Sequence, residues 1–234
     1  MAPLTCKLVV MPGLDGTGLL LDAFAKEMSR YCAADVLRYP SDMVSYDDLV
    51  PWVAERLPEA PFMLLAESFS GPLAIKVASA APDGLRGVIF ITSFARAPMG
   101  VPAVLAEGLR GVPVTSPLAL KIIAPFCVGL EPQPEIMELF AKALEQVPVD
   151  TLADRLREIL DTDETEALAA LPVPHGVIAG AHDRLVPPRR AEELKRGAAF
   201  FKTIDGPHFM MQRHPRAAAK AVKEAMICLG ATDV

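Results

Sequence analysis

The stretch LLAESFSGPLA, residues 64–74, sets an apolar run against Glu67 and Ser68, which small residues and then helix-like sequence follow. The apolar run has the length and composition of a strand that is buried on both faces of a sheet. A serine at its end either caps a helix, which is a common structural role, or forms the tip of a sharp strand-to-helix turn that exposes its hydroxyl. The surrounding sequence distinguishes these two interpretations.

Short apolar runs alternate with amphipathic segments on both sides of this stretch. We expect six strands, at residues 6–11, 34–40, 61–67, 86–93, 174–181 and 198–205. We expect helices at residues 19–31, 46–57, 72–82, 116–126, 134–147, 151–160, 187–197 and 215–230. Apolar strands separated by helices indicate a parallel sheet that is covered on both faces. The predicted fold class is therefore α/β, a doubly wound and mainly parallel six-stranded sheet.

The alternation of strands and helices stops between residues 96 and 171. This segment is rich in proline, and its periodicity predicts helices and no strand. We therefore predict a core formed by residues 1–95 and 172–234, with a helical cap inserted at residues 96–171. Three apolar stretches of the cap are candidates to line a pocket: VPAVLAEGL (101–109), PLALKIIAPFCVGL (117–130) and EIMELF (135–140).

The bulk composition excludes several classes of protein. The chain of 234 residues is 52% hydrophobic and 22% charged, as is usual for a globular domain. Its net charge of −6 argues against a nucleic-acid partner, since nucleic-acid binders normally carry a basic stripe. The N-terminal stretch MAPLTCKLVVMPG lacks the pattern of a signal peptide, and no run of about 18 apolar residues occurs. We expect a cytoplasmic protein with no stable membrane insertion.

The cysteines and histidines do not form a metal-binding pattern. The four cysteines are scattered without a CxxC pair, so we expect reduced and mostly buried thiols. The motif HExxH is absent and the four histidines are dispersed. We therefore expect no metal and no cofactor.

Three polar signatures each follow a predicted strand. They are Ser68, Asp183 in AGAHDRLVP (179–187), and His208 in IDGPHFMMQRHP (204–215). The carboxyl ends of parallel strands share one edge of the sheet, so we expect these side chains to converge there. A serine hydroxyl is a poor nucleophile unless a base takes its proton, and that base needs an acid to orient it. The three residues supply a nucleophile, an acid and a base.

The residues around Ser68 meet the steric needs of a tight turn. Ala66, Ser70 and Gly71 are all small, which a turn between a strand and a helix requires because the two backbones nearly touch. Ala66 and Ser70 stand where the usual G-x-S-x-G motif has glycines.

Three stretches resemble, in order and context, the nucleophile elbow, acid loop and histidine loop of the α/β-hydrolases. They are AESFSG, GAHDRLVP and GPHFMMQRHP. The resemblance covers nearly the whole chain. It implies a serine hydrolase with Ser68 as nucleophile, Asp183 as acid and His208 as base. It also implies a trimmed fold, since the first two of the family's usual eight strands are missing, and a cap that varies with the substrate.

The stretch MPGLDGTG (11–18) follows the first predicted strand. In the family this loop supplies one N–H group of the oxyanion hole, often after a His-Gly pair, and Pro12 and Gly13 stand in that place here. The resemblance therefore assigns the two donors to the N–H groups of Leu14 and Phe69. A dinucleotide-binding loop is the alternative, but the glycines are spaced GxxGxG rather than GxGxxG.

Other polar residues compete for these roles. His214 opens the last predicted helix and is interpreted as a cap or surface residue, and His182 flanks the acid. Asp205 ends the last strand and is the best alternative acid. Glu67 is a charged residue at the turn itself. It either bonds backbone groups near the turn or tunes His208, and the sequence leaves both open.

The expected function is hydrolysis of small-molecule carboxylic esters, with short to medium acyl chains favoured, through an acyl-enzyme on Ser68. An acyltransferase or a thioesterase would use the same three residues and remains an alternative. A non-catalytic small-molecule receptor on this fold is a further alternative. The sequence indicates no oligomeric state.

Overall fold

A single parallel sheet organises the molecule. The computed structural model describes residues 4–98, 103–131 and 133–232. Six strands lie in the order β2-β1-β3-β4-β5-β6, and every neighbouring pair is parallel. They are β1 (Lys7–Met11), β2 (Ala34–Val36), β3 (Phe62–Glu67), β4 (Leu85–Ile91), β5 (His175–Gly180) and β6 (Phe200–Ile204). The predicted doubly wound, six-stranded fold class is confirmed.

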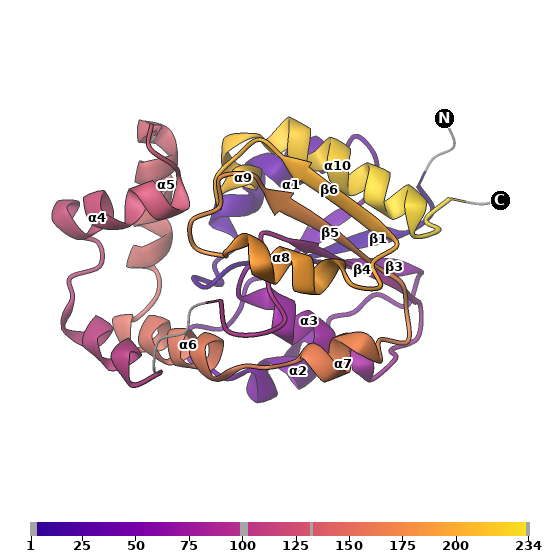
Figure 1. Ribbon diagram of the computed structural model, residues 1–234, viewed down its shortest axis with the longest axis horizontal. Helices are drawn as coiled ribbons and strands as arrows, with labels where there is room; N and C mark the ends of the chain where they lie inside the picture. Colours follow the sequence, from indigo (N-terminus) through magenta and orange to yellow (C-terminus); the bar gives the residue numbers. More distant parts are fainter. Residues whose placement is uncertain (1–3, 99–102, 132, 233–234) are drawn as a thin grey trace.

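Helices cover both faces of the sheet (Figure 1). Successive side chains of a strand point to opposite faces, so in β1 the buried Leu8 packs into one apolar cluster and the buried Val9 into another. The first cluster lies under α1 (Asp22–Met28) and α10 (Pro215–Cys228). The second lies under α2 (Tyr46–Ala54), α3 (Ser70–Ser79) and α8 (Pro188–Lys195).

The strand order places the reversal of winding between β1 and β3. The chain goes from β1 outward to β2 and then returns to pair β3 on the other side of β1. Ligands in open α/β sheets bind beyond the carboxyl ends of the strands at such a reversal. The loops after β1 and β3 are therefore the expected location of a site.

The chain between β4 and β5 is helical. It contains η2 (Ala103–Gly111), α4 (Pro117–Cys127), α5 (Pro134–Glu145), α6 (Val149–Asp161) and α7 (Thr165–Ala169). Among its described residues the only β-contact is a single antiparallel bridge between Arg96 and Asp163. Figure 1 shows α4 and α5 beyond the end of the sheet, whereas α7 lies with α2 and α3. The division into core and cap at residues 96 and 171 stays a prediction, and residues 101 and 102 of the first apolar stretch lie outside the described residues.

The expected elements are present with shifted ends. Each expected helix is found with ends that differ by up to three residues, and the sequence did not indicate η2, α7 or α9 (Met210–Arg213). The strand expected at 34–40 ends at Val36. Beyond it the chain bends along the loop that follows β1, where the Tyr39 N–H donates to the carbonyl of Gly16 at 2.8 Å.

All four cysteines lie in the described residues, and none forms a disulfide. Cys6 and Cys127 are buried, Cys32 is half-buried and Cys228 is exposed, so the expectation of burial holds for two of them. In the ranges that the structure covers, no helix combines the length and apolar composition that crossing a membrane needs.

Candidate active site

Ser68 forms the tip of a strained turn. It follows β3 directly and has a φ of 48°, in the left-handed region that non-glycine residues seldom adopt. Its N–H donates to the Ile91 carbonyl at 3.2 Å, and its own carbonyl accepts from the Ser93 hydroxyl at 2.6 Å. Because α3 begins two residues later, the positive end of the helix lies beside Ser68. Strain of this kind persists where the surrounding structure enforces it, commonly at functional sites.

Gly71 is the glycine that this turn requires. A Cβ atom at this position would lie 2.1 Å from the Ser93 hydroxyl and 2.5 Å from the Phe94 carbonyl. The backbone oxygen cannot rotate away as a side chain can, so only glycine fits without moving the turn.

Ser70 has a structural role of its own in place of the usual glycine. Its hydroxyl donates to the Pro12 carbonyl at 2.5 Å. The single proton is used there, so the Tyr39 hydroxyl, 2.6 Å away, donates to Ser70. Tyr46 donates to the Phe69 carbonyl at 2.9 Å. The loops after β1 and β2 and the start of α2 therefore hold the turn in place.

The structure brings Ser68, His208 and Asp183 into one hydrogen-bonded line. Nε2 of His208 lies 3.0 Å from the Ser68 Oγ, and Nδ1 lies 2.9 Å from Oδ2 of Asp183. The other oxygen of Asp183 accepts the N–H groups of Leu185 at 2.9 Å and Val186 at 2.8 Å. The histidine and aspartate side chains are each 4% exposed. The three predicted residues meet, and their catalytic roles stay predictions.

The surroundings of His208 suit a base. Burial lowers the pKa of His208, but the neighbouring Asp183 carboxylate and, less strongly, Glu67 outweigh this effect and raise the pKa above its usual value. A carboxylate only accepts hydrogen bonds, so the neutral ring carries its proton on Nδ1. Nε2 is then the acceptor that faces the Ser68 hydroxyl.

Across the described part of the chain, the N–H groups of Leu14 and Phe69 make no hydrogen bond. Leu14 lines the same cavity as Ser68, and Phe69 is the next residue after it. Both N–H groups remain candidates to bind an oxyanion.

Glu67 joins the loop after β1 to the segment that follows His208. Its side chain accepts the Gly13 N–H at 3.2 Å and the Gln212 Nε2–H at 2.8 Å. The residue is 5% exposed, and burial raises its pKa to about 7. Of the two roles left open by the sequence, a hydrogen bond to a backbone group is observed.

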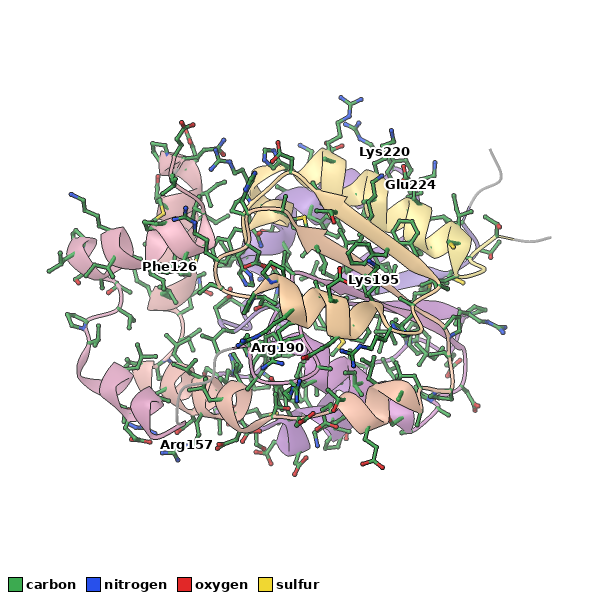
Figure 2. The ribbon with its side chains drawn as sticks, viewed as in Figure 1. Phe126, Arg157, Arg190, Lys195, Lys220 and Glu224 are labelled. Carbon is green, nitrogen blue, oxygen red and sulfur yellow. The ribbon has the colours of Figure 1, made fainter. Side chains whose placement is uncertain are left out.

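Arg155 is a residue of the site region that the sequence analysis missed. Its side chain, fully buried on α6, donates to the backbone carbonyls of Leu14 (3.1 Å), Asp15 (2.9 Å), Pro40 (2.8 Å) and Met43 (2.9 Å). Its spacing in the sequence could have revealed it, because Arg155 lies on the same buried face of α6 as Leu152 and Ile159. Arg157, by contrast, points away from the molecule (Figure 2).

The competing polar residues lie elsewhere. His182 Nε2 is 2.9 Å from Oδ1 of Asp205, and both side chains are mostly exposed. Asp205 thus pairs with His182 at the surface rather than with His208. His214 precedes α10 and makes no capping hydrogen bond with its side chain, and His175 bonds the Leu194 carbonyl within the core.

Ser68 and His208 line an apolar cavity of about 480 Å³. This volume is in the range of sites for small organic ligands. Of the described residues that line it, Asp15 and Glu67 carry carboxyl groups, and none is a lysine or arginine. Most of the wall is aliphatic or aromatic, from the loops after β1 and β4 and from the helical insertion: Leu14, Leu20, Phe94, Leu109, Val112, Val114, Ile122, Ile123, Phe140, Leu144, Leu152, Leu156 and Ile159.

Cys127 also lines this cavity but does not compete as a nucleophile. Burial, and to a smaller extent the Asp183 charge, raise the pKa of its thiol to about 12. The thiolate is the reactive form of cysteine, so the neutral thiol is inert near pH 7. A smaller cavity of about 280 Å³ lies behind Asp183, and neither Ser68 nor His208 lines it. In the residues covered by the structure, no group of three His, Cys, Asp or Glu side chains is placed to share a metal ion.

Comparison with known proteins identifies structural neighbours. No protein-family model matches the sequence, and no curated protein matches it. A hydrolase from Pseudomonas aeruginosa PA01 superposes with a TM-score of 0.78 at 21% identity, over 94% of this chain and 89% of that chain. The enol-lactonase from Burkholderia xenovorans LB400 (TM-score 0.79, 18% identity) and a thermophilic esterase from Thermogutta terrifontis (0.78, 19%) each cover 97% of this chain and 92% of theirs. These likenesses confirm the fold that the sequence predicted.

Proposed function

We propose that this chain, which has the α/β-hydrolase fold, is a serine hydrolase that cleaves carboxylic esters with neutral, apolar acyl groups. The proposal rests on one observation. A serine hydroxyl in a strained turn lies 3.0 Å from an imidazole that in turn lies 2.9 Å from a buried carboxylate, beside an apolar cavity. This is the arrangement by which a serine is activated as a nucleophile.

In the first step Ser68 Oγ attacks the carbonyl carbon of the ester. The hydroxyl proton passes to Nε2 of His208, and the electron pair of the carbonyl moves to its oxygen. The N–H groups of Leu14 and Phe69 stabilise this oxyanion, and each such donor lowers the barrier by about 3 kcal/mol. Asp183 stabilises the positive charge that forms on His208.

In the second step the bond to the leaving oxygen breaks and His208 returns its proton to the departing alcohol. A water molecule then attacks the acyl-enzyme while His208 takes one of its protons. The resulting tetrahedral intermediate collapses: the bond between the acyl carbon and Ser68 Oγ breaks, His208 returns its proton to that oxygen, and the carboxylic acid leaves.

The wall of the cavity supports the choice of acyl group. Apolar side chains make up most of it, so burial of a hydrocarbon acyl chain is favourable by about 0.8 kcal/mol for each methylene. The described lining offers carboxyl groups at Asp15 and Glu67 and no lysine or arginine to pair with an anionic substrate. We expect short to medium hydrocarbon chains to be preferred.

The test uses p-nitrophenyl esters of graded acyl length, together with one ester whose acyl chain ends in a carboxylate. We expect hydrolysis of the neutral esters, at least about tenfold slower reaction of the charged one because of like-charge repulsion, and reaction of a fluorophosphonate probe with Ser68. Ser68→Ala should abolish turnover and labelling. Ser79→Ala, at the far end of α3, is the matched control and should retain both.

The alternatives give different results. Turnover by Ser68→Ala would contradict the assignment of the nucleophile. Absence of both labelling and hydrolysis in the unmodified chain would favour a receptor. A higher rate with acyl thioesters, or acyl transfer to an added alcohol in preference to water, would assign a thioesterase or an acyltransferase instead.

A further inference from the structure

Glu67 lies where three parts of the molecule meet. It is the last residue of β3, its Oε2 accepts the N–H of Gly13 in the loop after β1, and its Oε1 accepts the side-chain amide of Gln212 in α9. Gly13 precedes Leu14, and α9 follows directly on the segment that contains His208. The two hydrogen bonds therefore connect the loop of a proposed oxyanion donor with the loop of the proposed base.

Burying a carboxyl group at this position costs free energy, and a residue with only a packing role would not need such a group. The carboxyl group is 5% exposed, and removing a charge from water is unfavourable even when hydrogen bonds replace the solvent. The neighbouring strand residues Leu64, Leu65 and Ala66 are apolar and fully buried. A buried ionisable group beside a nucleophile indicates a functional role.

We propose that Glu67 is a positioning residue of the hydrolase described above: its carboxylate fixes the loop that carries the Leu14 N–H relative to the loop that carries His208. The inference rests on the proposed function, since it concerns the geometry of the same reaction. Oxyanion stabilisation depends on donors held at the position where charge develops. Glu67 does not touch the reacting atoms, and it acts through Gly13 and Gln212.

The charge of Glu67 adds a second effect. Three titratable groups face it from other elements: His208 after β6, Asp15 after β1 and Tyr39 after β2. The negative charge of Glu67 favours the protonated form of His208. Loss of that charge should therefore make His208 a weaker base without removing the hydrogen bonds.

Gln212 allows the two effects to be separated. Its Oε1 atom is buried and has no hydrogen-bond partner among the described residues. If the Gln212 amide rotates by 180°, this oxygen accepts a hydrogen bond from the NH₂ group of a glutamine at position 67, while the single side-chain oxygen of that glutamine accepts the Gly13 N–H. Glu67→Gln therefore removes the charge and can keep both contacts, whereas Glu67→Met removes the charge and both contacts.

The experiment measures kcat and KM for a p-nitrophenyl ester, and the pKa of His208 by NMR titration. We expect Glu67→Met to lower kcat about 10- to 100-fold with KM changed less than about threefold, since misplaced catalytic groups cost about this much. We expect Glu67→Gln to keep kcat within about threefold near pH 9 and to lower the pKa of His208 by about half a unit. Glu193→Gln is the matched control and should change neither quantity, since Glu193 is a partly buried carboxylate bonded to Arg96 and Arg190 away from this cavity.

The proposal is overturned if Glu67→Met keeps kcat within about threefold of the unmodified chain, or if Glu67→Gln leaves the pKa of His208 unchanged. If Glu67→Met does not fold, Gln212→Leu takes its place, because it removes one of the two contacts and should also lower kcat. Labelling of Ser68 by the phosphonate separates the two hypotheses. If the Glu67 and Gln212 variants are labelled at Ser68 and hydrolyse the ester at the normal rate, the role of Glu67 is refuted. If the unmodified chain shows neither labelling nor hydrolysis, the proposed function itself is refuted.

Discussion

The guanidinium of Arg155 donates a 2.9 Å hydrogen bond to the carbonyl oxygen of Asp15, 140 residues earlier in the chain. Arg155 belongs to α6 in the helical insertion, and Asp15 to the loop after β1. Among the described residues, the hydrogen-bond partners of this buried arginine are all backbone carbonyls, and two of these carbonyls belong to Leu14 and Asp15. The insertion therefore supports the same loop that carries a proposed oxyanion donor.

Replacing Arg155 should weaken both the fold and the site. Arg155→Met leaves several buried or partly buried carbonyl groups without this donor, and we expect the free energy of unfolding in urea to fall by about 3 kcal/mol. The rate of ester hydrolysis should fall with it. Arg157→Met, two residues away on the exposed side of α6, should change stability by less than about 1 kcal/mol. Equal stability of the two variants would contradict a supporting role for Arg155.

Replacing Gly71 tests the close approach at the turn. In Gly71→Ala the new methyl group overlaps the Phe94 carbonyl, so the turn at Ser68 has to move. We expect a loss of about 2 kcal/mol in the free energy of unfolding and a fall of about 100-fold in kcat. Gly111→Ala adds a methyl group that no described atom beyond the adjacent residues and the local helix backbone approaches within 4 Å, and it should leave both values close to those of the unmodified chain.

The sequence predicted the fold because its main signals are local and strong. The central strands contain continuous apolar runs, such as residues 62–66, and the long helices have an apolar stripe. Of the elements that it missed, α7 and α9 have only five and four residues, and η2 is a 3₁₀-helix, which lacks the period of an α-helix. The strand at 34–40 was predicted too long because its end is set by hydrogen bonds to the loop after β1.

The site was predictable to the extent that its residues follow strands. Ser68 follows β3 directly, Asp183 and His208 lie in the loops after β5 and β6, and parallel strands bring such positions to one edge. Contacts that join distant segments left little trace in the sequence. Gln212 gave no signal of its contact with Glu67, 145 residues away. Arg155 gave only the weak signal of a charged residue on a buried helix face.

The activity should depend on pH through His208. Its pKa is raised above the ordinary value of about 6.5 because the Asp183 and Glu67 carboxylates outweigh the effect of burial. The base acts in its neutral form, so kcat/KM should fall as the pH decreases through a midpoint above 6.5. Asp183→Asn removes the main negative charge that raises the pKa of His208, so it should move this midpoint to lower pH. A midpoint well below 6.5 in the unmodified chain would contradict the assignment of His208 as the base.

Stability should depend on pH through Glu67. Its pKa is about 7 in the folded chain and 4.5 when unperturbed, so between these values the folded state holds a proton that the unfolded state releases. This contribution to stability is present below pH 4.5 and is lost as the pH rises through 7, with a total of about 3 kcal/mol.

Glu67→Gln removes this titration. Thermal unfolding should show Glu67→Gln gaining stability relative to the unmodified chain as the pH increases from 5 to 8. If the difference in Tm between the two proteins stays constant over this pH range, burial does not raise the pKa of Glu67.

The carboxyl groups that line the cavity also bear on the end of the catalytic cycle. On the proposed reaction a neutral ester becomes a carboxylate, and above pH 7 this new anion forms close to Asp15 and Glu67. No lysine or arginine of the described lining retains it. On this proposal, the chamber that accepts an uncharged ester should release its anionic product readily, and we expect accumulating acid to inhibit hydrolysis only weakly.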